Sequence, residues 1–316
     1  MNVNRGFIFW GLALVTAGAM ALAVQLGYID RGALAGAWRL WPLVLIAIGL
    51  SIILARTGLA IVGTVAAALV IGFAAGAVIA VGPGNVACGG TEPAQLTERH
   101  GTFSGPATVT LHFDCGSLDV SMSERQAWRV SSGSGGPATI QADAASLRVS
   151  RQGGQWWNAG RQHWAVTLPR QTTSSLEVEA NAASTNLDLL GGQFRRLIVH
   201  PNAGSLRMDL SGSTVDDLNL QMNAGSASII VGRGANLTGS LQVNAGSIEL
   251  CTGSAVAISI TLHSNITFSH NLDESGLEKD GNTWTSSPTA QGSSVVTLTI
   301  EGNAGSFTLN PEGGCA

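Results

Sequence analysis

The stretch "NAGSLRMDL" at residues 202–210 returns in close variants, as "NAGSASIIV" at 223–231, "NAGSIELCT" at 244–252 and "NAGSFTLNP" at 303–311. A repeat unit of 21 residues cannot bury its apolar face alone, so stacked units are expected to share a continuous core. The asparagine recurs at a constant step of 21 residues, with a further copy beyond the regular series: Asn181, Asn202, Asn223, Asn244, Asn265 and Asn303.

Apolar residues keep fixed offsets from this asparagine. Leucine or valine stands three residues before it, and leucine, methionine or isoleucine stands six residues after it in the regular copies that keep the pattern. Alternation on both sides predicts two strands per unit, each with one buried face, joined at the Asn-Ala-Gly-Ser corner. Weaker copies at Asp114 and Asp143 bring the total to eight units.

The constant step predicts an all-β, single-stranded β-solenoid with 21-residue repeats over residues 105–316. Inserts are expected near 150–170 and 270–294, where the step widens. A β-sandwich is the alternative, but it gives no reason for a constant step.

The corner motif is interpreted as structural. An asparagine amide can bond backbone groups that a bend leaves unpaired, and stacked amides can form a ladder. Glycine allows positive φ at the bend. A nucleophilic serine needs a base beside it, and no unit supplies a histidine at a matching offset. We therefore expect no enzymatic activity and no catalytic or cofactor-binding residue.

Residues 1–81 have a different composition, with few charges and long apolar runs. They predict a bundle of about three transmembrane helices, near 6–29, 38–56 and 58–81, followed by a linker at 82–104. A cleaved signal peptide is the alternative for the first run.

Positive-inside counting favours a cytoplasmic amino terminus. An odd number of spans then makes the chain a multi-pass protein of the cell membrane with an extracytoplasmic C-terminal domain. Gly72 and Gly76 form a small-xxx-small face that is compatible with self-association.

Charge and ligand patterns exclude several functions. The formal net charge is −4, and the acids concentrate after residue 81, which argues against a nucleic-acid partner. His200 and His263 share an outward column three units apart, roughly 14 Å at the spacing of stacked strands, which is too far to share a metal. No metal and no cofactor are expected.

The four cysteines show no metal-binding spacing. An even number in an extracytoplasmic domain permits two disulfides, and proximity in the sequence suggests Cys88–Cys115 and Cys251–Cys315. Four unpaired buried thiols are the alternative.

Three tryptophans, Trp156, Trp157 and Trp164, lie in the insert after residue 150 rather than in a core column. Exposed aromatic side chains commonly anchor partners or sugars, so these three are candidates for partner contact. The alternative is that they fold back and cover the end or side of the coil.

An apolar N-terminal region with Gly6, Trp10, Gly11 and the run "WPLVLIAIGL" (Trp41, Pro42 and Gly49 among its residues) precedes this repeat domain. The combination resembles bacterial LiaF-like cell-envelope stress proteins, whose C-terminal part is a toast-rack, or adhesin-like, repeat domain. The membrane resemblance covers about 5–56 and the repeat resemblance about 100–310. The four cysteines and the tryptophan-rich insert depart from the pattern.

The resemblance implies a non-enzymatic membrane protein that senses or modulates envelope stress, with a protein partner such as a sensor kinase. A surface adhesin or structural envelope component is the alternative. A glycan-cleaving enzyme is the third hypothesis, and no cluster of carboxylates supports it.

Overall fold

The computed structural model describes residues 5–25, 63, 65, 67–73, 97–133, 138–151, 161–253, 255–286, 294–312 and 314. The chain divides into two compact units, Met1–Gly90 and Thr91–Ala316. Each unit is described by itself.

The N-terminal unit contains one long described helix, α1 (Arg5–Gln25), and further helical backbone at 63, 65 and 67–73. No helix in the described part of this unit is long and apolar enough to cross a membrane. The predicted bundle of three transmembrane helices is therefore wrong. The middle predicted span, 38–56, lies outside the described residues.

The prediction relied on runs without charge, which is a weaker criterion than a long helix of apolar residues. A span needs about 20 apolar residues in one helix. In α1, Gly11, Ala17 and Gly18 contribute little apolar surface. Thr16 is polar, and its hydroxyl donates to the backbone oxygen of Leu12 at 2.7 Å, one helical turn earlier.

The C-terminal unit is all-β apart from one short 3-10 helix among its described residues, and its strands form a single 17-stranded sheet. In chain order the elements are β1 (Thr97–Thr102), β2 (Ala107–Ser123), β3 (Ala127–Gly133), β4 (Ala138–Ala142), β5 (Ser146–Arg151), β6 (Gln162–Pro169), β7 (Thr173–Asp188), β8 (Gln193–Phe194), β9 (Arg196–Asp209), β10 (Thr214–Met222), β11 (Gly225–Val231), β12 (Asn236–Thr252), β13 (Val256–Ser264), β14 (Phe268–His270), η3 (Leu272–Glu274), β15 (Glu278–Asp280), β16 (Thr283–Thr285) and β17 (Ser294–Leu309).

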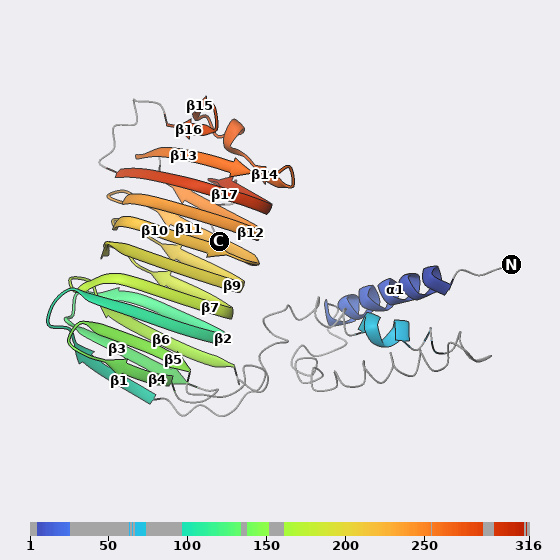
Figure 1. Ribbon diagram of the computed structural model, residues 1–316, viewed down its shortest axis with the longest axis horizontal. Coiled ribbons are helices and arrows are strands. Elements are labelled where there is room, and N and C mark those ends of the chain that lie inside the picture. Colours follow the sequence, from blue (N-terminus) through green and yellow to red (C-terminus); the bar gives the residue numbers. More distant parts are fainter. Residues whose placement is uncertain are drawn as a thin grey trace. The chain divides into compact units, whose positions relative to one another are not determined.

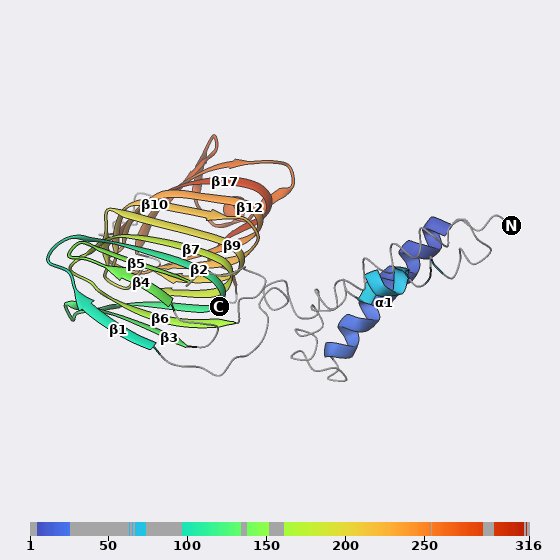
Figure 2. The same ribbon diagram turned by 60° about the horizontal axis from the view of Figure 1, so that its bottom comes forward.

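Most of these strands stack in parallel, and the 21-residue step of the sequence is the register between neighbours (Figure 1). Leu197 of β9 lies opposite Leu176 of β7 on one side and Leu218 of β10 on the other. Figure 2 shows the same stack of rungs, each rung being one repeat unit of the coil.

The order of rungs along the coil differs from the order along the chain. β17 lies between β12 and β13, with Ile300 opposite both Leu241 and Leu262. The chain therefore passes one position, forms β13 and the segment after it, and returns to fill the position with β17. The sequence pattern predicted the repeat unit at Asn303 but not its position in the stack.

The unit predicted at Asp143 is also corrected. Val149 of β5 lies opposite Leu111 of β2, so it occupies the place three residues before a corner rather than six after one. Asp143 instead closes the turn between β4 and β5, where its carboxylate accepts from the backbone nitrogens of Ala145 and Ser146. A carboxylate that bonds its own turn resembles a corner residue in sequence.

The two ends of the coil are closed differently. At the N-terminal end, β4 pairs antiparallel with β5, β3 with β6, and β1 with β3. At the C-terminal end, β16 pairs antiparallel with β13 over three residues, and β15 pairs with β16. We call residues 271–286, which include η3, β15 and β16, the C-terminal cap.

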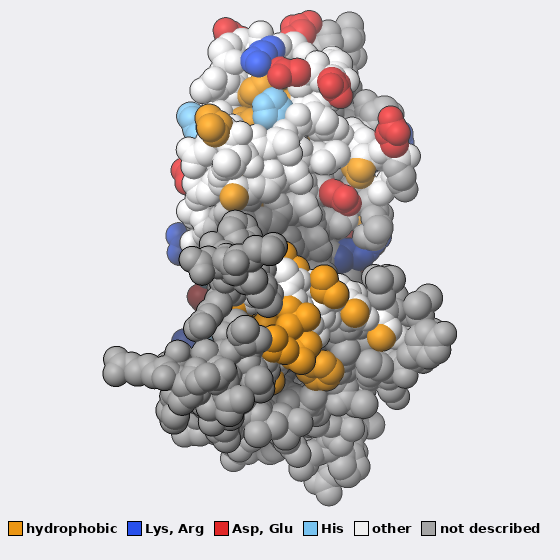
Figure 3. Space-filling view, turned by 90° about the vertical axis from the view of Figure 1, so that its right-hand side faces the viewer, with side chains coloured by type: hydrophobic (Ala, Val, Ile, Leu, Met, Phe, Trp, Pro, Cys, Tyr) orange, Lys and Arg blue, Asp and Glu red, His pale blue; other side chains and the backbone are white. Residues whose placement is uncertain are grey.

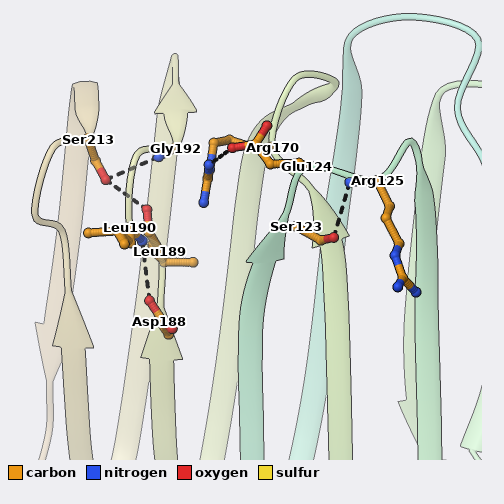
Figure 4. Close-up of polar contacts among 9 residues, drawn as sticks. All are labelled: Ser123, Glu124, Arg125, Arg170, Asp188, Leu189, Leu190, Gly192 and Ser213. Atoms are coloured by element: carbon orange, nitrogen blue, oxygen red, sulfur yellow. Dashed lines mark hydrogen bonds and ion pairs between the residues drawn. The ribbon is translucent and has the colours of Figure 1, made fainter.

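A second set of turns joins strands of neighbouring rungs, and Figure 4 shows some of them side by side. The hydroxyl of Ser213 donates to the backbone oxygen of Leu189 at 2.7 Å and accepts from the nitrogen of Gly192 at 3.2 Å. It thereby ties two neighbouring rungs together. Figure 4 also shows the contact of Arg170 with Glu124 in the adjacent turns.

The corner lies within a continuous strand in β2, β7, β9, β12 and β17, whereas it separates β10 from β11 at Asn223 and β13 from β14 at Asn265. The corner glycines have φ between +123° and +138°. A Cβ added there would lie 1.8–2.1 Å from a backbone oxygen of the next rung. Only glycine fits this approach. The residues concerned are Gly116, Gly204, Gly225, Gly246 and Gly305.

Replacing one corner glycine is expected to destabilise the whole stack. In Gly225→Ala, the new methyl group would meet the oxygen of Gly204 at 2.0 Å in an unfavourable backbone region. We expect a loss of about 3 kcal/mol in the free energy of unfolding, measured by thermal and chemical denaturation of the purified chain. Gly105→Ala is the control, because nothing lies within 4 Å of its added Cβ; equal stability of the two variants would contradict the assignment.

Candidate functional site

The six corner asparagines form one hydrogen-bonded ladder along the coil. Each donates its Nδ2 to the Oδ1 of the neighbour nearer the N-terminal end, and the ladder ends at Asp114. The successive distances are 3.3 Å (Asn265 to Asn303), 2.9 Å (Asn303 to Asn244), 2.7 Å (Asn244 to Asn223), 2.5 Å (Asn223 to Asn202), 2.7 Å (Asn202 to Asn181) and 3.0 Å (Asn181 to Asp114).

The ladder has a direction, and its two ends differ. Asp114 is a carboxylate, which only accepts, and its other oxygen lies 3.7 Å from the Nε of Arg151. At the opposite end, the Oδ1 of Asn265 accepts no hydrogen bond from the residues described. The asparagines bond one another and the backbone stack, so their geometry assigns them to the framework.

The serines after the corner glycines form a second column. Ser205 Oγ donates to Ser184 Oγ at 3.3 Å. A groove of about 560 Å³ runs along this column, with Arg207 and Glu249 on the rungs either side of Ser228. The groove offers hydroxyl donors and acceptors but presents no base beside these serines in the described part of the chain.

One serine of this column does have a histidine beside it, which the sequence analysis missed. His163 of β6 lies opposite Ser117 of β2, and its Nδ1 is 2.5 Å from the Ser117 hydroxyl. Asp119 approaches the same nitrogen at 4.0 Å. In a catalytic triad the nucleophile and the carboxylate contact different ring nitrogens of the histidine, so this group is a surface hydrogen bond rather than a triad.

Another outward column carries charge. Its order along the coil is His112, Glu179, His200, Gln221, Gln242, Glu301 and His263. The Nδ1 of His112 lies 2.9 Å from the carboxylate oxygen Oε2 of Glu179. Because β17 is interposed, His200 and His263 lie four rungs apart rather than three. Among the described residues, no group of three or more His, Cys, Asp or Glu side chains could hold a metal ion.

The structure separates the three candidate tryptophans. Trp164 is fully buried and packs edge to face on Phe113, with ring centroids 5.0 Å apart. It belongs to the core of a rung, not to an exposed insert, so its predicted role in partner contact is wrong. Trp156 and Trp157 lie outside the described residues.

Cys115 and Cys251 are both disulfide-bonded. Cys88 and Cys315 lie outside the described residues, and the predicted pairing of the four cysteines stays a prediction.

The C-terminal cap is organised by Asp273. Its Oδ1 accepts from Lys279 Nζ and from Trp284 Nε1, each at 3.0 Å. Lys279 also lies over the Trp284 ring, which stacks edge to face on His270. Hydrogen bonding from Lys279, followed by that from Trp284, lowers the pKa of Asp273 below its ordinary value of 3.8.

Two family models match the chain. Residues 104–231 match the N-terminal domain of toast_rack, and residues 8–53 match the LiaI-LiaF-like transmembrane region. The resemblance inferred from the sequence is confirmed by these matches. No curated protein matches the chain.

Two crystal structures resemble the chain. One is of a protein from Clostridium sporogenes ATCC 15579 described as a cell adhesion protein, with 15% identity and a TM-score of 0.43; the match covers 68% of this chain and 98% of the other. The second is of a protein from Bacteroides fragilis NCTC 9343 described as an adhesin, with 12% identity and a TM-score of 0.27, covering 68% and 97%.

Removing one asparagine from the ladder is expected to leave two neighbours unpaired. In Asn223→Ala, Asn244 loses its acceptor and Asn202 loses its donor. We expect a loss of about 1–2 kcal/mol in the free energy of unfolding, since water can partly replace the bonds. Asn219→Ala on the same strand, where the exposed side chain makes no described hydrogen bond, should change it by less than about 0.5 kcal/mol. Equal losses in both variants would argue against the ladder.

The cap is expected to loosen in acid. Because the pKa of Asp273 is lowered on folding, its carboxylate stabilises the cap above the ordinary value of 3.8. This stabilisation is lost as the pH falls through the lowered pKa. Indole hydrogen exchange of Trp284, followed by NMR against pH, should accelerate in that window, and Asp273→Asn should remove the dependence.

Proposed function

Because the chain joins a LiaI-LiaF-like transmembrane region to a toast-rack domain, we propose that it is a membrane-anchored envelope protein that senses or modulates cell-envelope stress. The β unit contacts another envelope protein, such as a sensor kinase, and no reaction is catalysed. The observation that carries this proposal is the presence of both regions in one chain.

The build of the β unit supports a role in binding. Its rungs are fixed to one another by the asparagine ladder and by the close approach at the corner glycines. Polar side chains in register, such as Ser205, Arg207 and His200, cover its outer faces. A stiff coil with a fixed pattern of polar groups suits recognition of a partner at a set position, because little ordering entropy is lost on binding.

The cysteines support an extracytoplasmic position for this unit. Cys115 and Cys251 are disulfide-bonded, and disulfides persist mainly in oxidising compartments. In this arrangement the N-terminal region holds the protein at the membrane while the coil meets its partner outside the cytoplasm.

A reporter for the envelope-stress response tests the proposal. In cells that lack the chain, reporter activity with and without a cell-wall antibiotic should change several-fold. The full chain should restore it, and a chain that lacks residues 97–316 should not. Site-specific photo-crosslinking from Arg207, on an exposed face, should recover a membrane sensor protein.

A surface adhesin is the competing function. An unchanged reporter together with lost attachment of cells to surfaces would favour the adhesin and contradict regulation. The Gly105→Ala chain, with its unperturbed fold, is the matched control for expression and localisation.

A further inference from the structure

The C-terminal end of the coil presents a strand edge that the cap covers only in part. β16 pairs with β13 at Ser259–Thr261, and Leu262 donates its backbone nitrogen to the backbone oxygen of Asn282. Beyond that point, β14 pairs only with β17 among the described strands. The outer edges of residues 263–264 and 268–269, on either side of the turn at 265–267, are therefore without a neighbouring strand in the described part of the unit.

Corner residues are exposed on an inner rung as well, at 223–226, but at this edge the exposed residues include a large aliphatic side chain. All five residues from His263 to Thr267 are exposed, and Ile266 is 102% exposed. Ile266 stands at the position after the corner asparagine, where the other five copies have alanine. A large aliphatic side chain in full contact with water, at the one open corner of the described rungs, marks a contact surface rather than a framework position.

The asparagine ladder also ends at this edge, and its last member has a hydrogen-bond acceptor that the described residues leave unused. Asn265 uses its Nδ2 on Asn303, and its Oδ1 accepts no hydrogen bond from the described residues. At the N-terminal end, by contrast, the ladder finishes at Asp114, and antiparallel strands β4 and β3 cover the last parallel rung. Natural sheets normally protect an edge with charge, proline or a covering segment. At the C-terminal end, main-chain hydrogen bonds from the cap reach the last parallel rung only at residues 258–262 in the described part of the unit.

The charge around the open edge indicates what kind of strand fits there. The neighbouring cap carries four acids, Asp273, Glu274, Glu278 and Asp280, and a single base, Lys279, which pairs with Asp273. Figure 3 shows acidic side chains gathered at this end of the β unit. Two copies meeting edge to edge would place like charges together, whereas a basic segment would be attracted.

We propose that the open edge of β13 and β14 binds an extended, basic segment of a protein partner, which adds one further rung to the coil. Main-chain hydrogen bonds to the strand residues on either side of the turn at 265–267 supply the binding energy. Ile266, in that turn, packs against an apolar side chain of the added strand, and the cap acids attract its lysines or arginines. This inference rests on the proposed function, because it names the chemistry of the protein partner.

Peptide binding to the full chain in detergent tests the proposal. The probe is a ten-residue peptide of alternating valine and lysine, compared with one of alternating valine and glutamate, by fluorescence anisotropy. The lysine peptide should bind at least about tenfold more tightly, and its affinity should fall with salt. Hydrogen exchange should show new protection at residues 263–269 and nowhere else in the coil.

Ile266→Lys should weaken binding of the lysine peptide by about tenfold or more, since it adds a like charge and removes the apolar contact. Leu190→Lys is the matched control, because Leu190 is an aliphatic turn residue, 48% exposed and remote from this edge. The control variant should bind the lysine peptide normally. Thermal unfolding of both variants checks that neither change acts through the fold.

Several outcomes would overturn the proposal. They are equal binding of both peptides, binding of neither, or protection located away from residues 263–269. If sedimentation shows that the chain is a dimer and Ile266→Lys makes it a monomer, the edge binds a second copy of the chain instead. If the lysine peptide does not bind but the stress reporter responds, the docking site is wrong and the proposed function stands. If the peptide binds but the reporter does not respond, the proposed function is wrong and the edge is still a peptide-binding site.

Discussion

Each rung of the coil can lie on the next only where two backbones pass without a side chain between them. At the corner glycines, a Cβ would lie within about 2 Å of the oxygen of the neighbouring rung. That close approach sets the register between rungs, and the register determines which side chains line up along the coil. It aligns the corner amides for the ladder, brings the serines together at one face and stacks the apolar residues of the core. The Asn-Ala-Gly-Ser motif recurs at residues 202, 223, 244 and 303 because this contact recurs at those corners.

The repeat was predictable from the sequence because its cause is local. An asparagine that bonds its neighbour recurs at each corner of the regular series, and a glycine with positive φ recurs at most of them, so their spacing is visible in the chain. The position of β17 in the stack could not be predicted, because β17 and β13 carry the same pattern and either could follow β12. Only the assembled coil shows that β17 lies next to β12. Trp164 was assigned to an insert for a related reason. It takes the place of a core leucine beside Leu118, but the sequence that precedes it departs from the 21-residue step.

Side-chain chemistry was less predictable than the fold. His163 meets Ser117 across rungs that are neighbours in space but 46 residues apart in sequence. Aligning β6 with the second half of β2 would have found this pair. The unprotected edge at Ile266 has a signal in the sequence as well, since it is the one asparagine corner where isoleucine replaces alanine. That signal acquires meaning only once the rung is known to be the last. Function in such a coil is therefore expected where the repeat is broken or ends.

The return of β17 between β12 and β13 affects how the protein is made. During synthesis, β13 and the cap emerge while their parallel neighbour β17 is still missing, so their final pairing cannot yet form. The growing chain must hold a partly formed end, with β12 exposed as a temporary edge, until residues 294–309 arrive. Pairing across a gap in the chain order is slow, because loop closure comes before the contacts that reward it. In a crowded cell this interval is the period when a chaperone would be most useful.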